Sequence, residues 1–168
     1  GDKAIRHIFF RENKAFISTG LGIIVFNTER IEISDTYEIL PTGSPEVNEV
    51  TVLNDTLFAA TEEGLYKGPL SEDLTIFGNW SIDLTVPEPF QLMENVSSVG
   101  GILYLNYRSG ETAGTYRRDQ AGWVRIHGDG DIEELKESEF GLIANRSYSI
   151  NARNLDGTEK FVLTQYEG

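Results

Sequence analysis

The apolar positions of this chain recur with a fixed period. Residues 5–24 align with residues 47–66 without a gap, so every aligned pair lies 42 positions apart. Identical residues fall at three places in this alignment, and these repeat residues are Phe16 and Phe58, Thr19 and Thr61, and Gly22 and Gly64. An apolar pair opens each unit and occurs four times, as Ile5 and Ile8, Val47 and Val50, Val96 and Val99, and Ile132 and Leu135. The pattern predicts four repeat units.

Each unit has the pattern of four short strands. A first strand leads through an Asn or Asp turn to an apolar second strand, which ends at Thr-x-x-Gly, where glycine can adopt the positive φ of a tight turn. A third strand follows, and a more amphipathic fourth strand closes the units at 31–33, 80–82, 123–126 and 161–163. Four antiparallel strands in about 42 residues are typical of a β-propeller blade.

We therefore predict an all-β fold of about four four-stranded antiparallel blades. The approximate blades are 4–40, 46–86, 90–127 and 131–166, within a single domain or sector that spans residues 1–168. Four blades are the lower limit for a closed propeller, and the sequence opens with Gly1 instead of methionine, so we expect a sector of a larger propeller from a longer protein. An open sector would expose sheet faces that neighbouring blades normally cover.

The third and fourth units depart from the pattern. In the third unit, Gly100-Gly101 replaces the Asn or Asp turn, and we expect Glu111 at the place of the threonine before Gly114. The fourth unit keeps no Thr-x-x-Gly, and its strands are expected at 140–144, 148–152 and 161–163, around an Asp156-Gly157 turn.

Charge and composition exclude several functions. The chain has 27 acidic and 14 basic residues, a formal charge of -13, and no cysteine. The charge would repel a phosphate backbone, which argues against nucleic-acid binding, and thiol chemistry is ruled out. No apolar run approaches the roughly 20 residues that span a bilayer, so we expect no membrane insertion. A protein partner with a basic face fits this charge, and its association rate should fall as salt rises.

The sequence contains no strong catalytic or metal-binding pattern. Gly20-Leu21-Gly22 precedes a strand instead of a helix, which favours a tight turn over phosphate binding, and His7 and His127 stand alone. Asp129-Gly130-Asp131, with Glu133 and Glu134, is better explained as a turn than as a calcium loop. We therefore predict no catalytic, cofactor-binding or metal-binding residues and no cofactor.

Aromatic and basic residues gather in the third unit. A candidate ligand or partner surface is formed by Tyr104, Tyr107, Tyr116, Arg117 and Arg118. Strand alternation places Tyr104 on the face opposite to its neighbouring leucines and predicts that it is exposed. Trp123 is expected to pack in the outer strand, and Pro87-Glu88-Pro89 is expected to be an extended linker.

The first two units resemble a known group of proteins. Their first-strand motifs, Ile5-Arg6-His7-Ile8 and Val47-Asn48-Glu49-Val50, and the following Thr-x-x-Gly turns resemble the propeller repeats of surface and periplasmic proteins of Bacteroidetes. The run from Asn13 to Phe26, followed by residues 33–37, more specifically resembles the N-terminal propeller domains of the PorZ family of the type IX secretion system.

The resemblance implies a function and a location. It implies a non-catalytic scaffold that binds other secretion proteins in the complex that attaches cargo, exported to the periplasm or the outer-membrane surface. Because such proteins work beside an anionic lipopolysaccharide, the acidic charge of this domain predicts that recognition of that ligand resides elsewhere. Two alternatives remain open: a periplasmic saccharide-sensing propeller of a hybrid two-component regulator, and a propeller enzyme that processes glycans.

Overall fold

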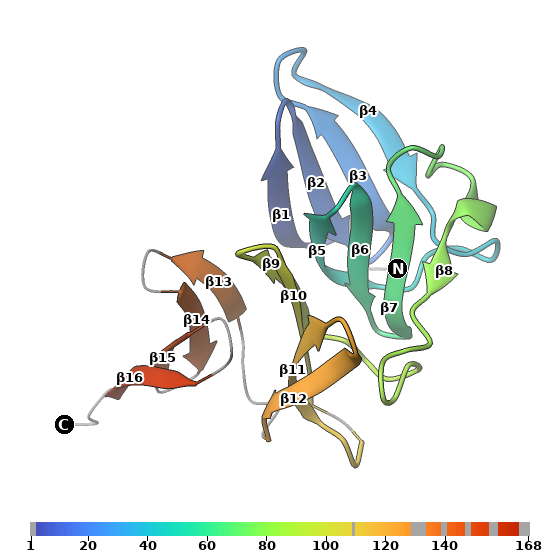
Figure 1. Cartoon of the computed structure of the whole chain (residues 1–168). Helices are drawn as coiled ribbons and strands as arrows, with labels where there is room; N and C mark the ends of the chain where they lie inside the picture. The colour runs from blue at the N-terminus through green and yellow to red at the C-terminus, as the bar shows by residue number, and fades with distance from the viewer. Residues whose placement is uncertain are drawn as a thin grey trace.

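The computed structural model describes residues 3–108, 110–128, 134–138, 141–146, 149–154 and 158–164, and nearly all of their regular structure is β (Figure 1). Sixteen strands form four antiparallel sheets, each with four strands in sequence order. Besides these strands, the described residues contain one 3-10 turn, η1 (Phe77–Asn79). The predicted all-β fold of four four-stranded antiparallel sheets is confirmed.

The strands follow one another along the chain in groups of four. The first sheet contains β1 (Ile5–Arg11), β2 (Lys14–Thr19), β3 (Gly22–Asn27) and β4 (Glu32–Tyr37). The second contains β5 (Val47–Leu53), β6 (Thr56–Thr61), β7 (Gly64–Pro69) and β8 (Ser81–Ile82). The third contains β9 (Asn95–Val99), β10 (Ile102–Tyr107), β11 (Gly114–Asp119) and β12 (Gly122–His127). The fourth contains β13 (Glu134–Ser138), β14 (Gly141–Arg146), β15 (Ser149–Arg153) and β16 (Glu159–Thr164).

The four sheets are arranged around a common centre. Strand β5 contacts β1, β9 contacts β5, and β13 contacts β9, so the first strands of successive sheets adjoin. The fourth strands lie toward the outside, as Figure 1 shows for β4, β8, β12 and β16. This is the radial arrangement of propeller blades.

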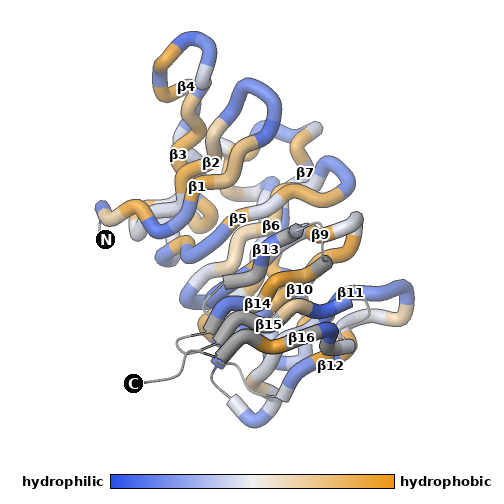
Figure 2. The backbone as a smooth tube through the Cα atoms, turned by 90° about the vertical axis from the view of Figure 1, so that its left-hand side faces the viewer, coloured by the Kyte–Doolittle hydropathy of each residue, from blue (hydrophilic) through white to orange (hydrophobic). Residues whose placement is uncertain are grey.

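Apolar side chains fill the spaces between successive sheets. Apolar segments therefore alternate with polar turns along the backbone (Figure 2). The core between the first and second sheets includes Phe16, Ile23, Val25, Val47, Val50, Leu57 and Ala59. The core between the second and third includes Phe58, Ala60, Val96, Leu103, Leu105, Tyr107 and Tyr116. The core between the third and fourth includes Val99, Tyr104, Leu142 and Ala144.

The repeated threonine and glycine build the same turn in the first two sheets. The Thr61 hydroxyl donates to the Gly64 carbonyl oxygen at 2.8 Å and accepts the Glu63 N–H at 3.1 Å, and Thr19 makes the equivalent pair of bonds. Gly64 has a φ of 144°, and a Cβ there would collide with the carbonyl oxygen of Pro89. The glycine is required both by its conformation and by this close approach.

The strand pairing in the third sheet differs from the sequence alignment. Gly114 pairs with Tyr107, just as Gly22 pairs with Thr19 and Gly64 with Thr61. Tyr107, and not Glu111 as predicted, therefore stands at the place of the threonine. A longer connection between β10 and β11 displaced the expected alignment.

This register also explains the position of Tyr104. It places Tyr104 at the site occupied by Phe16 and Phe58 in the first two sheets, so each inter-sheet core receives an aromatic side chain at this position from the second strand of the preceding sheet. Tyr104 is completely buried, and the prediction that it is exposed is wrong. Tyr104 does lie on the face opposite to Leu103 and Leu105, but this does not expose it, because other sheets cover both faces of the strand.

A strained turn connects β3 to β4 in the first sheet. Ile31 has a φ of 57° and is 77% exposed, although a β-branched residue is disfavoured in this left-handed region. We expect Ile31→Gly to raise the free energy of unfolding by about 0.5–1 kcal/mol, since it removes this strain. Urea unfolding measures the change. The matched variant Ile33→Gly, within β4, should instead destabilise the chain, and equal losses from both variants would contradict the explanation.

Candidate binding groove

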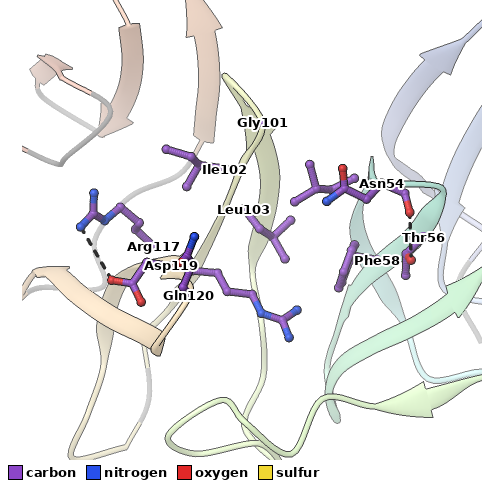
Figure 3. A pocket seen from close by; sticks show the side chains of 11 residues that line it. Asn54, Thr56, Phe58, Gly101, Ile102, Leu103, Arg117, Asp119 and Gln120 are labelled. Atoms are coloured by element: carbon purple, nitrogen blue, oxygen red, sulfur yellow. Dashed lines mark hydrogen bonds and ion pairs between the residues drawn. The ribbon is translucent and has the colours of Figure 1, made fainter.

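A groove of about 700 Å³ lies between the second and third sheets (Figure 3). It is lined by Leu53, Asn54, Thr56, Phe58, Gly101, Ile102, Leu103, Arg117, Arg118, Asp119 and Gln120. Asn54, Thr56 and Phe58 belong to the second sheet and its first hairpin turn, whereas the residues from Gly101 onward belong to the third. The groove thus combines apolar side chains with amide, hydroxyl and guanidinium groups, a mixture found in sites for small polar ligands.

The two arginines of the predicted surface point in different directions. They are neighbours on β11, so strand alternation directs their side chains to opposite faces of the sheet. The Arg118 Nη1 atom lies 3.3 Å from Oδ2 of Asp83, the residue that follows the last strand of the second sheet. The Arg118 guanidinium carbon lies 5.8 Å from the centre of the Trp123 ring. The Arg117 Nη2 atom lies 3.9 Å from Asp119 Oδ2. They therefore do not form a joint cationic patch.

Asp83 is a buried anion beside the groove. Its side chain is fully buried, and its Oδ1 accepts the Thr85 hydroxyl at 2.6 Å and the Thr85 N–H at 3.1 Å. Lys67 Nζ lies 3.6 Å from the same oxygen. Burial alone raises the pKa of Asp83, but the Thr85 hydrogen bonds, Lys67 and Arg118 outweigh it and lower the pKa below the usual aspartate range. The ionised carboxylate joins the second sheet to the third.

Sequence reasoning missed Asp83, although a signal for its turn is present. Asp83-Leu84-Thr85 repeats the pattern of Asp73-Leu74-Thr75, in which Asp73 Oδ1 also accepts the N–H and the hydroxyl of the following threonine. The pattern identifies a local turn. It does not distinguish the exposed Asp73 from the buried Asp83, because that difference arises from the neighbouring sheet.

The remaining tyrosines of the predicted surface belong to the core. Tyr107 and Tyr116 are buried, and their rings stack at a centroid distance of 5.4 Å. The Tyr107 hydroxyl and Thr112 Oγ1 are 2.6 Å apart, and the Tyr116 hydroxyl donates to the Thr112 carbonyl oxygen at 2.5 Å. Burial raises the pKa of Tyr107 above its usual range, so its hydroxyl stays protonated. These two side chains hold the connection between β10 and β11.

The predicted linker takes part in the same network. Glu88 Oε2 accepts the Thr112 hydroxyl at 2.6 Å and the Thr112 N–H at 3.1 Å. These hydrogen bonds lower the pKa of Glu88 below its usual range. The segment that includes Pro87 and Pro89 therefore does more than link two sheets, because it holds the β10–β11 connection against the segment that follows β8.

We expect Glu88→Ala to release this connection. At pH 7 the Thr112 amide should exchange its hydrogen roughly tenfold faster, because its charged acceptor is lost. Hydrogen exchange followed by NMR measures this, with Glu111→Ala as the exposed control on the same connection. Because the folded pKa of Glu88 lies below the unfolded value of about 4.3, the contribution of its carboxylate to stability is complete only well above that value and is lost as pH falls through the folded pKa. If the exchange rate of the Thr112 amide at pH 7 is unchanged in Glu88→Ala, Glu88 does not hold this connection.

The two histidines lie at different sheet interfaces. His7 Nε2 lies 3.4 Å from Glu49 Oε1, and His127 Nδ1 lies 3.2 Å from Arg153 Nη2. Within the described part of the chain, no group of three or more histidine, cysteine, aspartate or glutamate side chains is arranged to hold a metal ion. Asp129, Gly130, Asp131 and Glu133 lie outside the described residues, as do Phe140, Tyr148 and the Asp156-Gly157 turn.

Comparison with known proteins adds a functional context. Residues 1–81 match the family described as the N-terminal β-propeller domain of the type IX secretion protein PorZ. This match confirms the resemblance to PorZ-family propellers. No curated protein sequence matches the chain. The described residues contain no helix that is long and apolar enough to cross a membrane.

Solved structures extend the likeness in fold to the whole chain. PorZ of Porphyromonas gingivalis, described as an essential bacterial surface component of the type IX secretion system, superposes with a TM-score of 0.75 at 18% identity, over 96% of this chain and 21% of that one. The Pan2 WD40 domain of Neurospora crassa gives 0.67 at 12% identity, over 96% and 50%. The computationally designed protein Ika8 gives 0.60 at 9% identity, over 96% and 49%. At these identities the likeness shows the propeller fold alone, and the chain spans about a fifth of the PorZ chain.

Proposed function

We propose that this chain serves as a non-catalytic propeller scaffold in a type IX secretion system, and that it binds other proteins of the cargo-attachment complex at the periplasmic or outer surface of the outer membrane. The observation that carries the proposal is the match of residues 1–81 to the PorZ propeller family. The structure supports a scaffold because Asp83, Glu88, Tyr104 and Tyr107 all hold sheets and connections together.

A partner with a basic face suits the acidic charge of the chain. The experiment immobilises the purified chain and measures the association of purified type IX secretion components from the organism that encodes it, at 0.05 M and 0.3 M salt. Binding whose association rate falls at the higher salt supports the proposal. Absence of binding to every component, together with normal cargo attachment in cells that lack this segment, would overturn it.

Anionic lipopolysaccharide is a ligand that the chain is expected not to bind. With a formal charge of -13, the chain should be repelled by it, so the isolated chain is expected not to bind it tightly at low salt. Binding to purified anionic lipopolysaccharide at two salt concentrations tests this. Tight binding that survives about 0.3 M salt would show that the surface recognises this glycan despite its charge.

Saccharide binding in the groove is a second candidate function. Asn54, Gln120 and Arg118 offer hydrogen-bonding groups there beside the ring of Phe58. A glycan array with micromolar hits that are lost in Gln120→Ala would favour this function. Glycan hydrolysis is less well supported, because it requires two carboxylates, and Asp119 is the single carboxylate among the described residues that line the groove.

A further inference from the structure

A pocket of about 390 Å³ lies at the end of the sheets opposite to the candidate groove. The groove is lined by residues of the β5–β6 and β11–β12 turns, whereas the pocket is lined by residues of the β6–β7 turn and of the connections between sheets. These two sets of turns lie at opposite ends of β6 and β11. The charged residues that line the pocket are Arg6, Glu46, Glu62, Glu94 and Arg108.

Four of these five charges neutralise one another. Arg6 pairs with Glu46, and Arg108 Nε lies 2.7 Å from Glu94 Oε2. Glu62 is the fifth, and none of the described lysines, arginines and histidines forms an ion pair with it. The pocket therefore presents one carboxylate whose charge is not compensated by a neighbouring cation.

Hydrogen bonds hold Glu62 against the connection between β4 and β5. Its Oε1 accepts the Glu46 N–H at 3.2 Å, and its own N–H donates to the Glu46 carbonyl oxygen at 3.1 Å. By the strand register, the turn position of Glu62 holds Gly20 in the first sheet and Arg108 in the third. The carboxylate is thus oriented in advance, and it belongs to the second sheet alone among these three.

An apolar segment borders the same pocket. Segment 89–93 crosses the β6–β7 turn, because its first carbonyl oxygen lies against Gly64 and its last N–H donates to the Thr61 carbonyl oxygen at 2.8 Å. The segment carries Phe90, which is 72% exposed, and Leu92, which is 41% exposed and lines the pocket. The aliphatic stem of a long charged side chain can pack on such a surface while its head reaches a polar group.

We propose that this pocket binds an arginine side chain of a protein partner, with the guanidinium against Glu62 and the aliphatic stem against Leu92. The inference rests on the proposed function, in which the partner has a basic face. A guanidinium is planar and matches a carboxylate in bidentate geometry, whereas a lysine ammonium is a strongly hydrated point charge. Arginine is also enriched among the residues that dominate the binding energy of protein interfaces.

Other occupants fit the pocket less well. An anion would face the Glu62 carboxylate, and both arginines of the pocket already have carboxylate partners. In the part of the chain that the structure describes, no three acidic or histidine side chains are placed to hold a metal ion. A second copy of the chain would bring another formal charge of -13, so like charge opposes its approach.

The test uses N-acetyl-L-arginine amide as the probe and the whole chain labelled with ¹⁵N. In an NMR titration, the backbone amide signals of Glu62 and Leu92 should move saturably, with a dissociation constant on the order of 1–10 mM that rises between 0.05 M and 0.3 M salt. The citrulline analogue has nearly the same shape without the charge and should bind at least about fivefold more weakly. The lysine analogue should bind at least about twofold more weakly than the arginine analogue.

Variants of the chain locate the site. Glu62→Gln keeps an oxygen that can accept the Glu46 N–H but removes the charge, and it should weaken binding of the arginine analogue at least about fivefold. Glu72→Gln is the matched control, because Glu72 is an exposed carboxylate that does not line the pocket, and it should leave the affinity unchanged. Leu92→Arg supplies a guanidinium from the chain itself and should abolish binding, which keeps the test open if Glu62→Gln does not fold.

Equal weakening by Glu62→Gln and Glu72→Gln would overturn the proposal, because binding would then reflect overall charge. Equal affinity for the arginine, lysine and citrulline analogues would also overturn it. Binding of purified secretion components distinguishes this inference from the proposed function. If a component binds the natural chain and Glu62→Gln equally well, the pocket is not its docking site and the scaffold function stands. If no component binds but the arginine analogue behaves as expected, the pocket stands and the assignment to type IX secretion fails.

Discussion

Truncation of Phe58 to alanine is expected to lower the free energy of unfolding by about 3–5 kcal/mol. Phe58 is 5% exposed and belongs to the core between the second and third sheets, where Leu103 and Val96 are also buried. Removing the ring leaves a cavity that flanking β-strands cannot fill by a small movement. Guanidinium unfolding followed by tryptophan fluorescence measures the loss.

Two controls separate the cavity from a general effect of losing a phenylalanine. Phe77→Ala removes a ring that is 51% exposed in the 3-10 turn, and it should change stability by less than about 0.5 kcal/mol. Tyr104→Ala removes the equivalent aromatic side chain of the third sheet and should be as costly as Phe58→Ala. A loss for Phe58→Ala no larger than that for Phe77→Ala would show that the aromatic position does not hold the sheets together.

Replacement of Asp83 by alanine is the second change with a large expected effect. It removes the anion between Lys67 and Arg118 and leaves two cations facing each other across the second and third sheets. Loss of one partner of a buried ion pair costs about 3–5 kcal/mol, and we expect about 2–3 kcal/mol because both cations are partly exposed and can turn toward water. Thermal and denaturant unfolding at pH 7 measure this loss.

The chain offers a matched control for Asp83 in Asp73. Asp73 makes the same turn with the threonine two positions later but lies at the surface, where none of the described lysines or arginines forms an ion pair with it, so Asp73→Ala should have a much smaller effect. The folded pKa of Asp83 lies below the unfolded value of about 3.9, so its contribution to stability is complete above about pH 5 and is lost as pH falls through the folded value. The two curves of stability against pH, for the natural chain and for Asp83→Ala, should therefore converge in acid. Parallel curves down to pH 2 would contradict the role of the carboxylate.

The regular part of the fold could be predicted because the repeat is local in sequence. The gapless register of the first two units identified the paired strands, and the Thr-x-x-Gly turn identified the glycine with positive φ. Both features depend on residues within a few positions of one another, where turn geometry restricts the amino acids allowed.

The candidate site could be predicted only in part, because it depends on which sheet faces which. Tyr104 and Arg117 were grouped by their nearness in sequence, yet Tyr104 is buried in the core and Arg117 pairs with Asp119. Asp83 and Glu88 were not singled out as site residues, since their partners Arg118 and Thr112 lie 35 and 24 positions away in sequence. The alternation of residues along one strand does not predict such contacts, because it does not tell which other sheet packs against each face of the strand.

Each inter-sheet core has a consequence for how the chain can be divided. The core between the first and second sheets takes Phe16 and Val25 from one repeat and Val50 and Ala59 from the next. The unit that repeats in sequence is therefore not the unit that folds, because cutting at the repeat boundary near residue 46 separates the two halves of one core. The smallest piece able to unfold cooperatively is a pair of adjacent sheets, and shuffling experiments should exchange segments that run from the middle of one sheet to the middle of the next.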